Sequence, residues 1–180
     1  MTYMIDSRLK LRQYINMDLE ANRQASKIKK SEIARLLIYL RHIEFYTNCN
    51  SGLISKVLRY YYRYRYHRLS VYTGISIGIN SFGPGLTIPH YGSIVVNSSA
   101  RFGSRVVLQN GVNISENASG GDHIYFGAGS KIMRNVKLGS DQIIGANAVV
   151  TRDFIEDNIV IAGVPANKIS DNGYKGRNEV

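Results

Sequence analysis

The stretch VNSSARFGSRVVLQNGVNISENASGGDHIYFGAGSKIMRNVKLGSDQIIGANAVV, residues 96–150, repeats with a period of six. Every sixth residue is large and apolar except Gly120, and the set is Val96, Phe102, Leu108, Ile114, Gly120, Phe126, Ile132, Leu138, Ile144 and Val150. The residues four places further on are mostly Ala, Val or Ser. An α-helix repeats near 3.6 residues and a simple strand every two, so neither explains this frame. The period predicts a hexapeptide β-helix, in which three units form one coil of a triangular prism.

Residues suited to tight corners follow the same frame. Polar residues that tolerate a left-handed backbone recur there, at Asn97, Asn117, Asn135, Asp141 and Asn147. Glycine directly follows several inward residues, at positions 103, 127, 139 and 145, where it tolerates a crowded turn. Stacked coils bury one continuous core, and the two ends of the stack need caps.

The cap at the front is expected to be helical. Ile33, Leu36, Leu37, Leu40 and Ile43 are spaced three and four apart, which is typical of an amphipathic helix. A helix start is expected at residues 31–34, a break at 48–52 and a second helix from residue 53 to about 69. We therefore divide the chain into a helical N-terminal region (1–70), a β-helix domain (71–169) and a flexible tail (170–180).

Length and composition exclude several classes of protein. The chain has 180 residues, 44% of them hydrophobic, which is enough to bury a substantial core in one domain. No apolar run of about 18 residues occurs, so we expect no membrane-spanning segment, and the first residues show no signal-peptide pattern. Cys49 is the single cysteine, which excludes an internal disulfide and favours a cytoplasmic location.

The net charge of +10 is concentrated in the first part of the chain. Residues 1–74 contain fourteen Lys and Arg against five Asp and Glu, whereas residues 75–180 contain nine against eight. The segment LRYYYRYRYHR, residues 58–68, alternates tyrosine with arginine. It could pack its tyrosines on the first coil, or contact an acidic glycan, an anionic membrane or nucleic acid. No nucleic-acid motif accompanies it, so we expect no nucleic-acid partner.

The segment from Phe82 to Ile169 resembles the hexapeptide-repeat acyltransferases, in the branch of serine acetyltransferases and surface-polysaccharide O-acetyltransferases. The stretches that carry the resemblance are FGPGLTIPHYGSIVVN (82–97), FGAGSKI (126–132), IGANAVV (144–150) and AGVPANKI (162–169). The resemblance implies a mainly-β fold, a left-handed parallel β-helix with a short helical N-terminal region. It also implies a homotrimer that binds acetyl-CoA in the groove between neighbouring prisms.

His90 is the candidate catalytic base. Acetyl transfer to a hydroxyl needs a base, because a hydroxyl that keeps its proton is a poor nucleophile. By the six-residue count His90 occupies an inward position, six before Val96, where a polar residue interrupts the apolar ladder. The resemblance implies that His90 is the family's base. A backbone carbonyl or Ser76 could orient it.

The other histidines are weaker candidates. His123 could correspond to a second histidine that serine acetyltransferases carry on a loop, but the frame leaves no room for that loop, so we expect an ordinary corner. His42 and His67 fall in the helical region. The four histidines offer no three-ligand zinc cluster, and we expect no metal.

Small residues are the candidate contacts for the acetyl donor. In relatives, small residues let the pantetheine arm approach the coils, and the matching positions here are Gly127, Ala128, Gly145 and Ala146. Alternatively, these residues serve only to shape the corners. Lys168 matches a basic residue that often meets the phosphates of coenzyme A.

The prediction of the acceptor depends on where this sequence differs from serine acetyltransferases. Those enzymes carry an aspartate before the base, where this chain has Pro89, and another about fifteen residues earlier, where residues 74–77 contain no acid. A serine zwitterion needs charged partners, because burying an unpaired ammonium is costly. The departures therefore favour a larger acceptor, with Tyr91, Arg63 and Arg65 as candidate contacts.

We predict an acetyl-CoA-dependent O-acetyltransferase that modifies a sugar hydroxyl of a bacterial surface polysaccharide, capsular or lipopolysaccharide-type, or of its precursor. Transfer is expected to be direct, since no Ser or Cys stands in a nucleophile motif. The protein would be cytoplasmic, with peripheral contact to an anionic membrane or an acidic glycan. Two alternatives stay open: a serine O-acetyltransferase and a non-catalytic β-helix scaffold.

Overall fold

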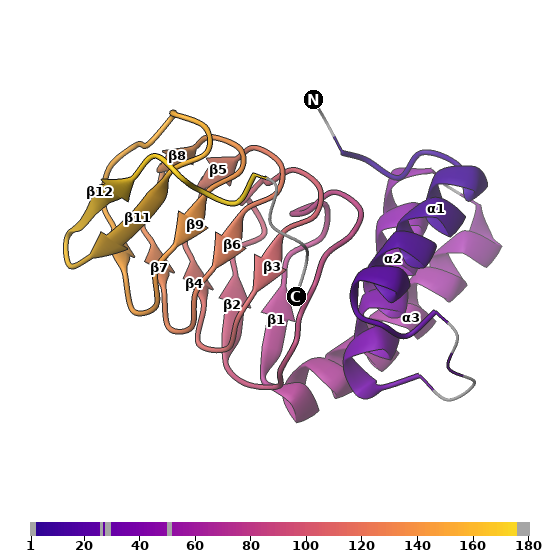
Figure 1. The fold of residues 1–180 in the computed structure, drawn as a ribbon. Coiled ribbons are helices and arrows are strands. Elements are labelled where there is room, and N and C mark those ends of the chain that lie inside the picture. The colour runs from indigo at the N-terminus through magenta and orange to yellow at the C-terminus, as the bar shows by residue number, and fades with distance from the viewer. Residues whose placement is uncertain (1–2, 26, 28–29, 50–51, 176–180) are drawn as a thin grey trace.

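The computed structural model describes residues 3–25, 27, 30–49 and 52–175, and within them three helices cover one end of a β-helix (Figure 1). The helices are α1 (Arg8–Ala21), α2 (Glu32–Asn48) and α3 (Leu53–Thr73). The strands are β1 (Ile75–Ile77), β2 (Ile94–Val96), β3 (Val107–Leu108), β4 (Asn113–Ile114), β5 (Ser119–Gly120), β6 (Tyr125–Phe126), β7 (Lys131–Ile132), β8 (Lys137–Leu138), β9 (Ile143–Ile144), β10 (Val149–Val150), β11 (Val160–Gly163) and β12 (Ala166–Ser170). The predicted class, a mainly-β parallel β-helix with an N-terminal helical region, is confirmed.

Each regular coil takes eighteen residues, or three hexapeptides. Asn113 of β4 pairs in parallel with Lys131 of β7, eighteen residues later, and Lys131 pairs with Val149 of β10. Strands of successive coils stack into faces, ordered β1-β2-β4-β7-β10, β3-β6-β9-β11-β12 and β5-β8. The antiparallel hairpin of β11 and β12 closes the far end of the stack.

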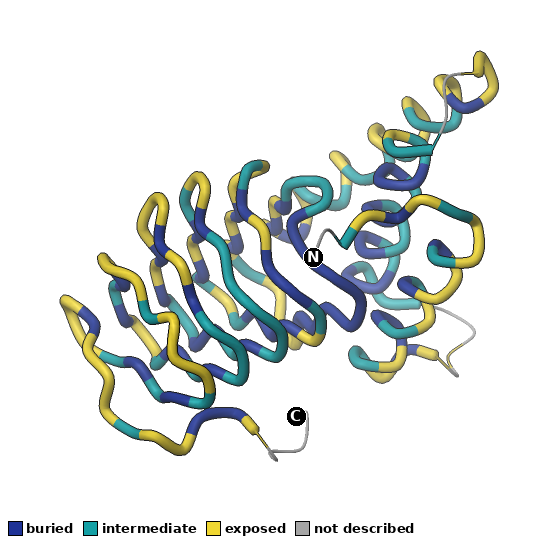
Figure 2. The backbone as a smooth tube through the Cα atoms, turned by 90° about the horizontal axis from the view of Figure 1, so that it is seen from above, coloured by how far each residue is buried: buried dark blue, intermediate teal, exposed yellow. Residues whose placement is uncertain are grey.

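The apolar ladder points into the prism, as the period predicts. Apart from Gly120, the ladder residues between Val96 and Val150 are at most 6% exposed. Exposed positions gather at the outer corners of the coils (Figure 2). Gly120 interrupts the ladder because a Cβ there would lie 2.7 Å from Cδ1 of Phe102, whose ring fills the space.

Left-handed corners carry most of the predicted polar residues. Asn117, Asn135, Asp141 and Asn147 have φ between 55° and 62°. Asn97 differs, since its φ is not positive. Its Oδ1 instead accepts a hydrogen bond from the backbone N–H of Ser99, at 3.0 Å. This contact forms a local turn of the kind that Asn favours.

The first coil departs from the regular frame on two sides. Its inward residues are Ile77, Phe82 and Ile88, all at most 4% exposed, and the next inward residue is Val96. A regular side takes six residues, but the side from Ile77 to Phe82 takes five and the side from Ile88 to Val96 takes eight. The additional residues place His90 on an exposed corner. The predicted inward position of His90 is therefore wrong, because the six-residue count does not hold across this corner.

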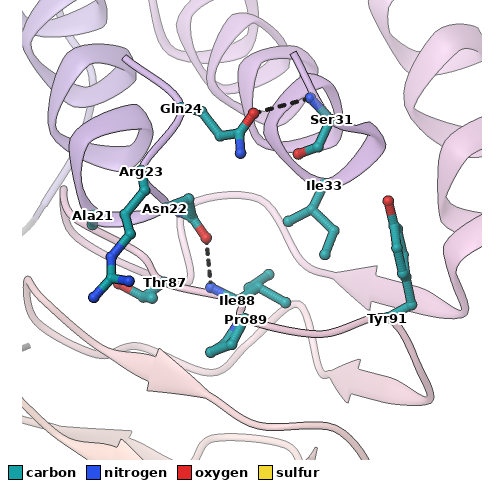
Figure 3. Close-up of a pocket in the computed structure, with 10 residues that line it drawn as sticks. All are labelled: Ala21, Asn22, Arg23, Gln24, Ser31, Ile33, Thr87, Ile88, Pro89 and Tyr91. Carbon is teal, nitrogen blue, oxygen red and sulfur yellow. Dashed lines mark hydrogen bonds between the residues drawn. The ribbon is translucent and has the colours of Figure 1, made fainter. Parts of the chain in front are cut away.

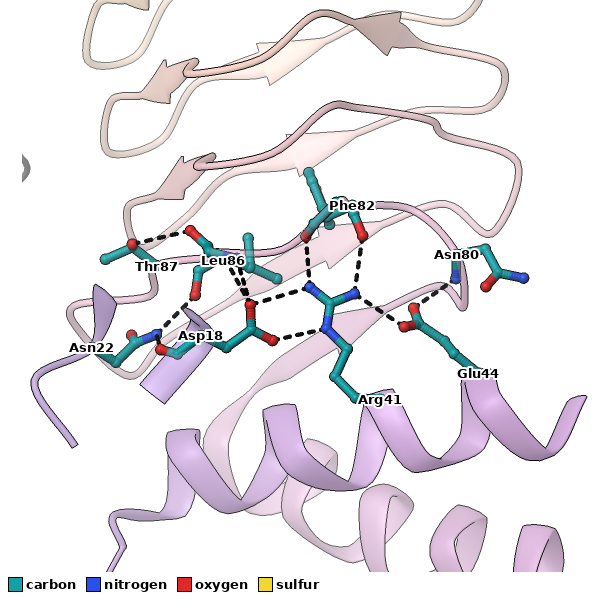
Figure 4. Close-up of polar contacts among 10 residues, drawn as sticks. Asp18, Asn22, Arg41, Glu44, Asn80, Phe82, Leu86 and Thr87 are labelled. Atoms are coloured by element: carbon teal, nitrogen blue, oxygen red, sulfur yellow. Dashed lines mark hydrogen bonds and ion pairs between the residues drawn. The ribbon is translucent and has the colours of Figure 1, made fainter. Parts of the chain in front are cut away.

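A buried ionic cluster fastens the helices to this first coil (Figure 4). The Arg41 guanidinium is 1% exposed, and its Nε donates to Asp18 Oδ2 at 2.7 Å. Its terminal nitrogens donate to Glu44 Oε2 at 3.0 Å and to the carbonyl oxygens of Phe82 at 2.9 Å and Gly83 at 2.7 Å. Burial lowers the pKa of Arg41, but the two carboxylates more than reverse that effect.

The two carboxylates also hold the coil directly. Asp18 Oδ1 accepts hydrogen bonds from the backbone N–H groups of Gly85 and Leu86, at 2.8 and 2.9 Å. Glu44 Oε1 accepts from the N–H of Asn80 at 2.7 Å. Burial raises the pKa of Glu44, and Arg41 opposes that rise. The cluster thus ties α1 and α2 to the segment that leads into the His90 corner.

The region boundaries differ somewhat from those predicted. Ser31 caps α2, its hydroxyl accepting from the N–H of Ala34, while α3 continues to Thr73, past the predicted boundary at residue 70. Residues 170–175 pack on the β-helix rather than forming a free tail, since Tyr174 is 3% exposed and donates its N–H to the Asp141 carbonyl. Residues 176–180 lie outside the described ranges. Among the helices described, none is long and apolar enough to cross a membrane.

Candidate functional site

His90 lies on the long corner of the first coil, with its side chain exposed. Its neighbours Pro89 and Tyr91 are exposed as well. In the part of the chain that the structure describes, no hydrogen bond holds the His90 ring, so both ring nitrogens are open to a ligand. Ser76, considered as an orienting group, instead lines a different pocket together with Arg63 and His67.

A pocket of about 340 Å³ lies between this corner and the turn that follows α1 (Figure 3). Its lining residues are Ala21, Asn22, Arg23, Gln24, Ser31, Ile33, Thr87, Ile88, Pro89 and Tyr91. The Asn22 side chain joins the two walls, since its Nδ2 donates to the Leu86 carbonyl at 2.8 Å and its Oδ1 accepts from the Ile88 N–H at 2.9 Å. The pocket therefore belongs to both the helical region and the first coil.

Opposite charges border this pocket. Arg23 is exposed, has a left-handed backbone with φ 54°, and forms no ion pair within the described ranges. Glu32, at the start of α2, accepts a hydrogen bond from the Tyr91 hydroxyl at 2.9 Å. This hydrogen bond to Glu32 raises the pKa of Tyr91. A cation and a carboxylate thus lie beside the corner that carries His90.

Sequence reasoning missed both Arg23 and Glu32. Neither belongs to the six-residue repeat or to a motif, and each is separated from His90 by more than 55 residues of sequence. The turn after α1 and the start of α2 reach the corner because the helices dock there, through the ionic cluster and through the apolar face of α2, which shares the core of the first coil. No signal in the sequence reports that contact.

The predicted donor-binding residues lie at one corner of two successive coils. Gly127 donates its N–H to the Ile144 carbonyl at 2.8 Å, and the carbonyl of Ala128 accepts from the N–H of Asn147 at 2.8 Å. Ala128 is half-buried, whereas Ala146, one coil further on, is exposed. The two alanines therefore present small side chains at a corner that a pantetheine arm could follow.

The glycines before those alanines serve the coil stack. A Cβ on Gly127 would lie 2.7 Å from the backbone N of Ala146, and one on Gly145 would lie 2.8 Å from the Cβ of Ala162. We expect Gly127→Ala to lower the free energy of unfolding by about 1–3 kcal/mol, because the next coil must shift. Urea denaturation would measure this loss. Ala146→Ser, at the exposed position, is the control and should change stability by less than about 0.5 kcal/mol. Unchanged stability of Gly127→Ala would contradict this account of the packing.

Lys168 already has anionic partners. Its ammonium lies 2.5 Å from Glu156 Oε2 and 2.6 Å from Asp171 Oδ1. These two carboxylates raise the pKa of Lys168. A phosphate of coenzyme A would therefore have to compete with both.

The structure separates Arg63 and Arg65 from Tyr91. Both arginines lie on α3: Arg63 is exposed, and the Arg65 guanidinium lies over the rings of Tyr39 and Tyr61. Neither lines the pocket that contains Tyr91, so the three predicted acceptor contacts do not form one site.

His123 occupies a corner, as expected. Its φ is 56°, its Nδ1 lies 2.8 Å from Asp141 Oδ1, and its ring stacks on Tyr174. Among the described residues no group of three His, Cys, Asp or Glu side chains could hold a metal ion.

Comparison with known proteins gives a consistent set of relatives. The chain is 31% identical over 108 residues to the serine acetyltransferase of Mycobacterium tuberculosis, covering 55% of this chain and 47% of that protein. The matched region thus spans about half the length of that relative. No protein-family model matches.

Solved structures share the fold. Serine acetyltransferase from Brucella abortus in complex with coenzyme A aligns with a TM-score of 0.69 and 20% identity, over 93% of this chain and 71% of that one. The Neisseria gonorrhoeae serine acetyltransferase in complex with serine aligns with a TM-score of 0.65 and 23% identity, over 91% and 71%.

These relatives contradict the polysaccharide acceptor predicted from the sequence, since all of them are named for serine. Their sequences and folds agree with the hexapeptide frame, the coil stack and the helical cap described above. The similarity in sequence and fold supports assigning this chain to the hexapeptide-repeat acyltransferase superfamily.

Proposed function

We propose that this chain is an acetyl-CoA-dependent O-acetyltransferase with the hydroxyl of L-serine as its acceptor. The observation that carries the proposal is the eight-residue side of the first coil, which presents His90 in the open beside a pocket with an available cation. The names of the relatives support the donor and the acceptor.

Both charged groups of serine find a partner at this pocket. The Arg23 guanidinium is placed to receive the carboxylate, and Glu32, beside Tyr91, is placed to receive the ammonium. A zwitterion requires such partners, because a charge removed from water without one is costly. Glu32 would take the role of the acid that the sequence lacks at Pro89.

His90 would act as the general base. It takes the proton from the serine hydroxyl, and the oxygen attacks the carbonyl carbon of the thioester. The resulting tetrahedral intermediate collapses by breaking the carbon–sulfur bond, and the departing thiolate receives the proton from His90. The products are O-acetylserine and free coenzyme A, with no acyl-enzyme.

The donor would lie along the corner that contains Ala128 and Ala146. His90 is exposed on a single chain, so a groove that excludes water from it would need a neighbouring copy. We therefore include a homotrimer in the proposal, with acetyl-CoA between adjacent prisms.

Release of coenzyme A by the purified protein tests the proposal. Acetyl-CoA would be supplied with L-serine, with acidic or neutral glycan fragments, or without acceptor, and mass spectrometry would identify the product. We expect turnover and O-acetylserine with L-serine alone. Turnover with a glycan and not with serine would overturn the acceptor, and absence of coenzyme A binding would favour a non-catalytic scaffold.

Arg23→Gln tests the carboxylate contact. A hydrogen bond to a charged group contributes about 1.5–3 kcal/mol, so we expect KM for L-serine to rise about 10- to 100-fold. The KM for acetyl-CoA should stay unchanged. Arg12→Gln, an exposed arginine on α1, is the matched control and should leave both constants unaltered. An unchanged KM for serine in Arg23→Gln would exclude this contact.

A further inference from the structure

Helix α3 carries an exposed apolar stripe that its packing does not explain. Leu53, Val57, Tyr60, Tyr64 and Val71 recur at helical spacing, and each is 59–79% exposed. Beside the stripe lie three more exposed apolar residues, Ile54, Tyr61 and Tyr72. Half of the exposed large hydrophobic residues in the described ranges therefore lie on this one helix.

The opposite face of α3 holds the helix to the protein. Ser55 and Thr73 are buried there, and Tyr62 stacks on His42 of α2 with ring centroids 4.3 Å apart. The Tyr66 hydroxyl donates to the carbonyl of Ile77 at 2.8 Å and accepts from its N–H at 2.9 Å. The exposed stripe is thus held outward by a fixed set of contacts.

Cations flank the stripe on both sides. At 100° per residue, Lys56 and Arg63 lie along one edge and Arg68 along the other, and all three are exposed. The helix sequence LISKVLRYYYRYRYHRLSVYT also contains Arg59 and Arg65 and has no Asp or Glu. Its whole length therefore presents positive charge around an apolar centre.

This combination fits an anionic lipid surface. Aliphatic side chains enter the boundary of the hydrocarbon, tyrosines are favoured at the bilayer interface, and lysine and arginine attract acidic headgroups. A second copy of α3 would bring a further set of cations against these, with no carboxylate on either helix. Nucleic acid would leave Leu53, Ile54, Val57 and Val71 without an apolar partner.

We propose that α3 docks this protein on anionic lipid bilayers as a peripheral, surface-lying helix. The apolar stripe enters the interface while the flanking cations contact the headgroups. The proposal does not depend on the acceptor of the acetyl group. Docking by this face leaves the β-helix, on the other side of α3, free of the membrane.

Cosedimentation of the full chain with vesicles tests the proposal. The vesicles would be phosphatidylcholine alone or phosphatidylcholine mixed with phosphatidylglycerol. We expect binding to the mixed vesicles only, weakening as salt is added. The double variant Lys56→Gln/Arg63→Gln should lower the partition coefficient about fivefold per charge removed. The double variant Leu53→Ser/Val57→Ser should lower it by at least about tenfold.

Matched controls distinguish binding by this surface from nonspecific binding to vesicles. Leu9→Ser and Arg12→Gln change an exposed leucine and an exposed arginine on α1 and should leave binding unaltered. Circular dichroism would verify that each variant is folded. Equal binding to both kinds of vesicle, or none to either, would overturn the proposal.

Two further results would assign the surface to another partner. Leu53→Ser/Val57→Ser would dissociate the protein in analytical ultracentrifugation without vesicles if the stripe joined two copies. Tighter binding to an oligonucleotide than to the mixed vesicles, unaffected by that variant, would indicate nucleic acid. Either result would overturn the lipid assignment.

Discussion

His90→Ala is expected to lower kcat for acetyl transfer to L-serine by about 10²- to 10⁴-fold, the usual contribution of a general base. Without the imidazole, the serine hydroxyl must lose its proton to water before or during attack on the thioester. The His90 side chain is exposed and makes no hydrogen bond within the described ranges, so its removal should not unfold the protein. Stopped assays of coenzyme A release with saturating serine would measure the loss.

The matched control is His67→Ala, which removes an exposed histidine from α3. His67→Ala should retain the turnover of the unaltered protein. Its melting temperature should equal that of His90→Ala. Acetyl-CoA affinity should be equal in both variants, because the proposed donor contacts lie on other coils. Turnover by His90→Ala within a few-fold of the unaltered protein would exclude His90 as the base.

Arg41→Met is expected to cost about 3–5 kcal/mol of unfolding free energy, the usual penalty for removing one partner of a buried ion pair. The substitution keeps much of the side-chain volume but leaves Asp18 and Glu44 buried without their cation. It also leaves the carbonyls of Phe82 and Gly83 without a donor. Urea denaturation followed by circular dichroism would measure the change, with Arg35→Met on the same helix as the control.

The pH dependence of Arg41→Met distinguishes a lost ion pair from lost packing. Burial raises the pKa of Glu44, and without the guanidinium the largest contribution that opposes this rise is lost, so the folded variant binds a proton there more readily than the unfolded chain does. Its stability should therefore rise relative to the unaltered protein as the pH falls from neutral toward 5. A deficit of the same size at both pH values would assign the effect to packing alone.

The repeating part of the fold was readable from the sequence because its contacts are periodic. Each coil of the prism places Phe126, Ile144 and their equivalents in the same surroundings. One residue in six must therefore be apolar, and this requirement is visible in the sequence as a period of six. The left-handed corners at Asn117, Asn135, Asp141 and Asn147 follow for the same reason. His123 was predicted at a corner from the frame alone, and it lies at one.

The candidate site was only partly readable because it lies where the period fails. The motif around His90 identified a candidate base, but counting by six gave it an inward position. Only the pairing of Thr87 with Val107 and of Ile77 with Val96 reveals the eight-residue side that exposes it. Gly127 and Gly145 were predicted as donor contacts, but the close packing of the next coil already explains why both are glycine.

The sequence by itself determined the β-helix, its inward ladder and the helical character of the N-terminal region, and it proposed a histidine as the base. Tertiary structure alone decided what surrounds that histidine. Arg23 and Glu32 reach the corner because α1 and α2 dock on the first coil. The apolar face of α2 packs there, and Arg41, Asp18 and Glu44 fix the position through hydrogen bonds to backbone groups, which leave no pattern in the residue types. The direction of the α3 stripe was decided in the same way, since only the packing of Tyr62 and Tyr66 shows which face of that helix remains exposed.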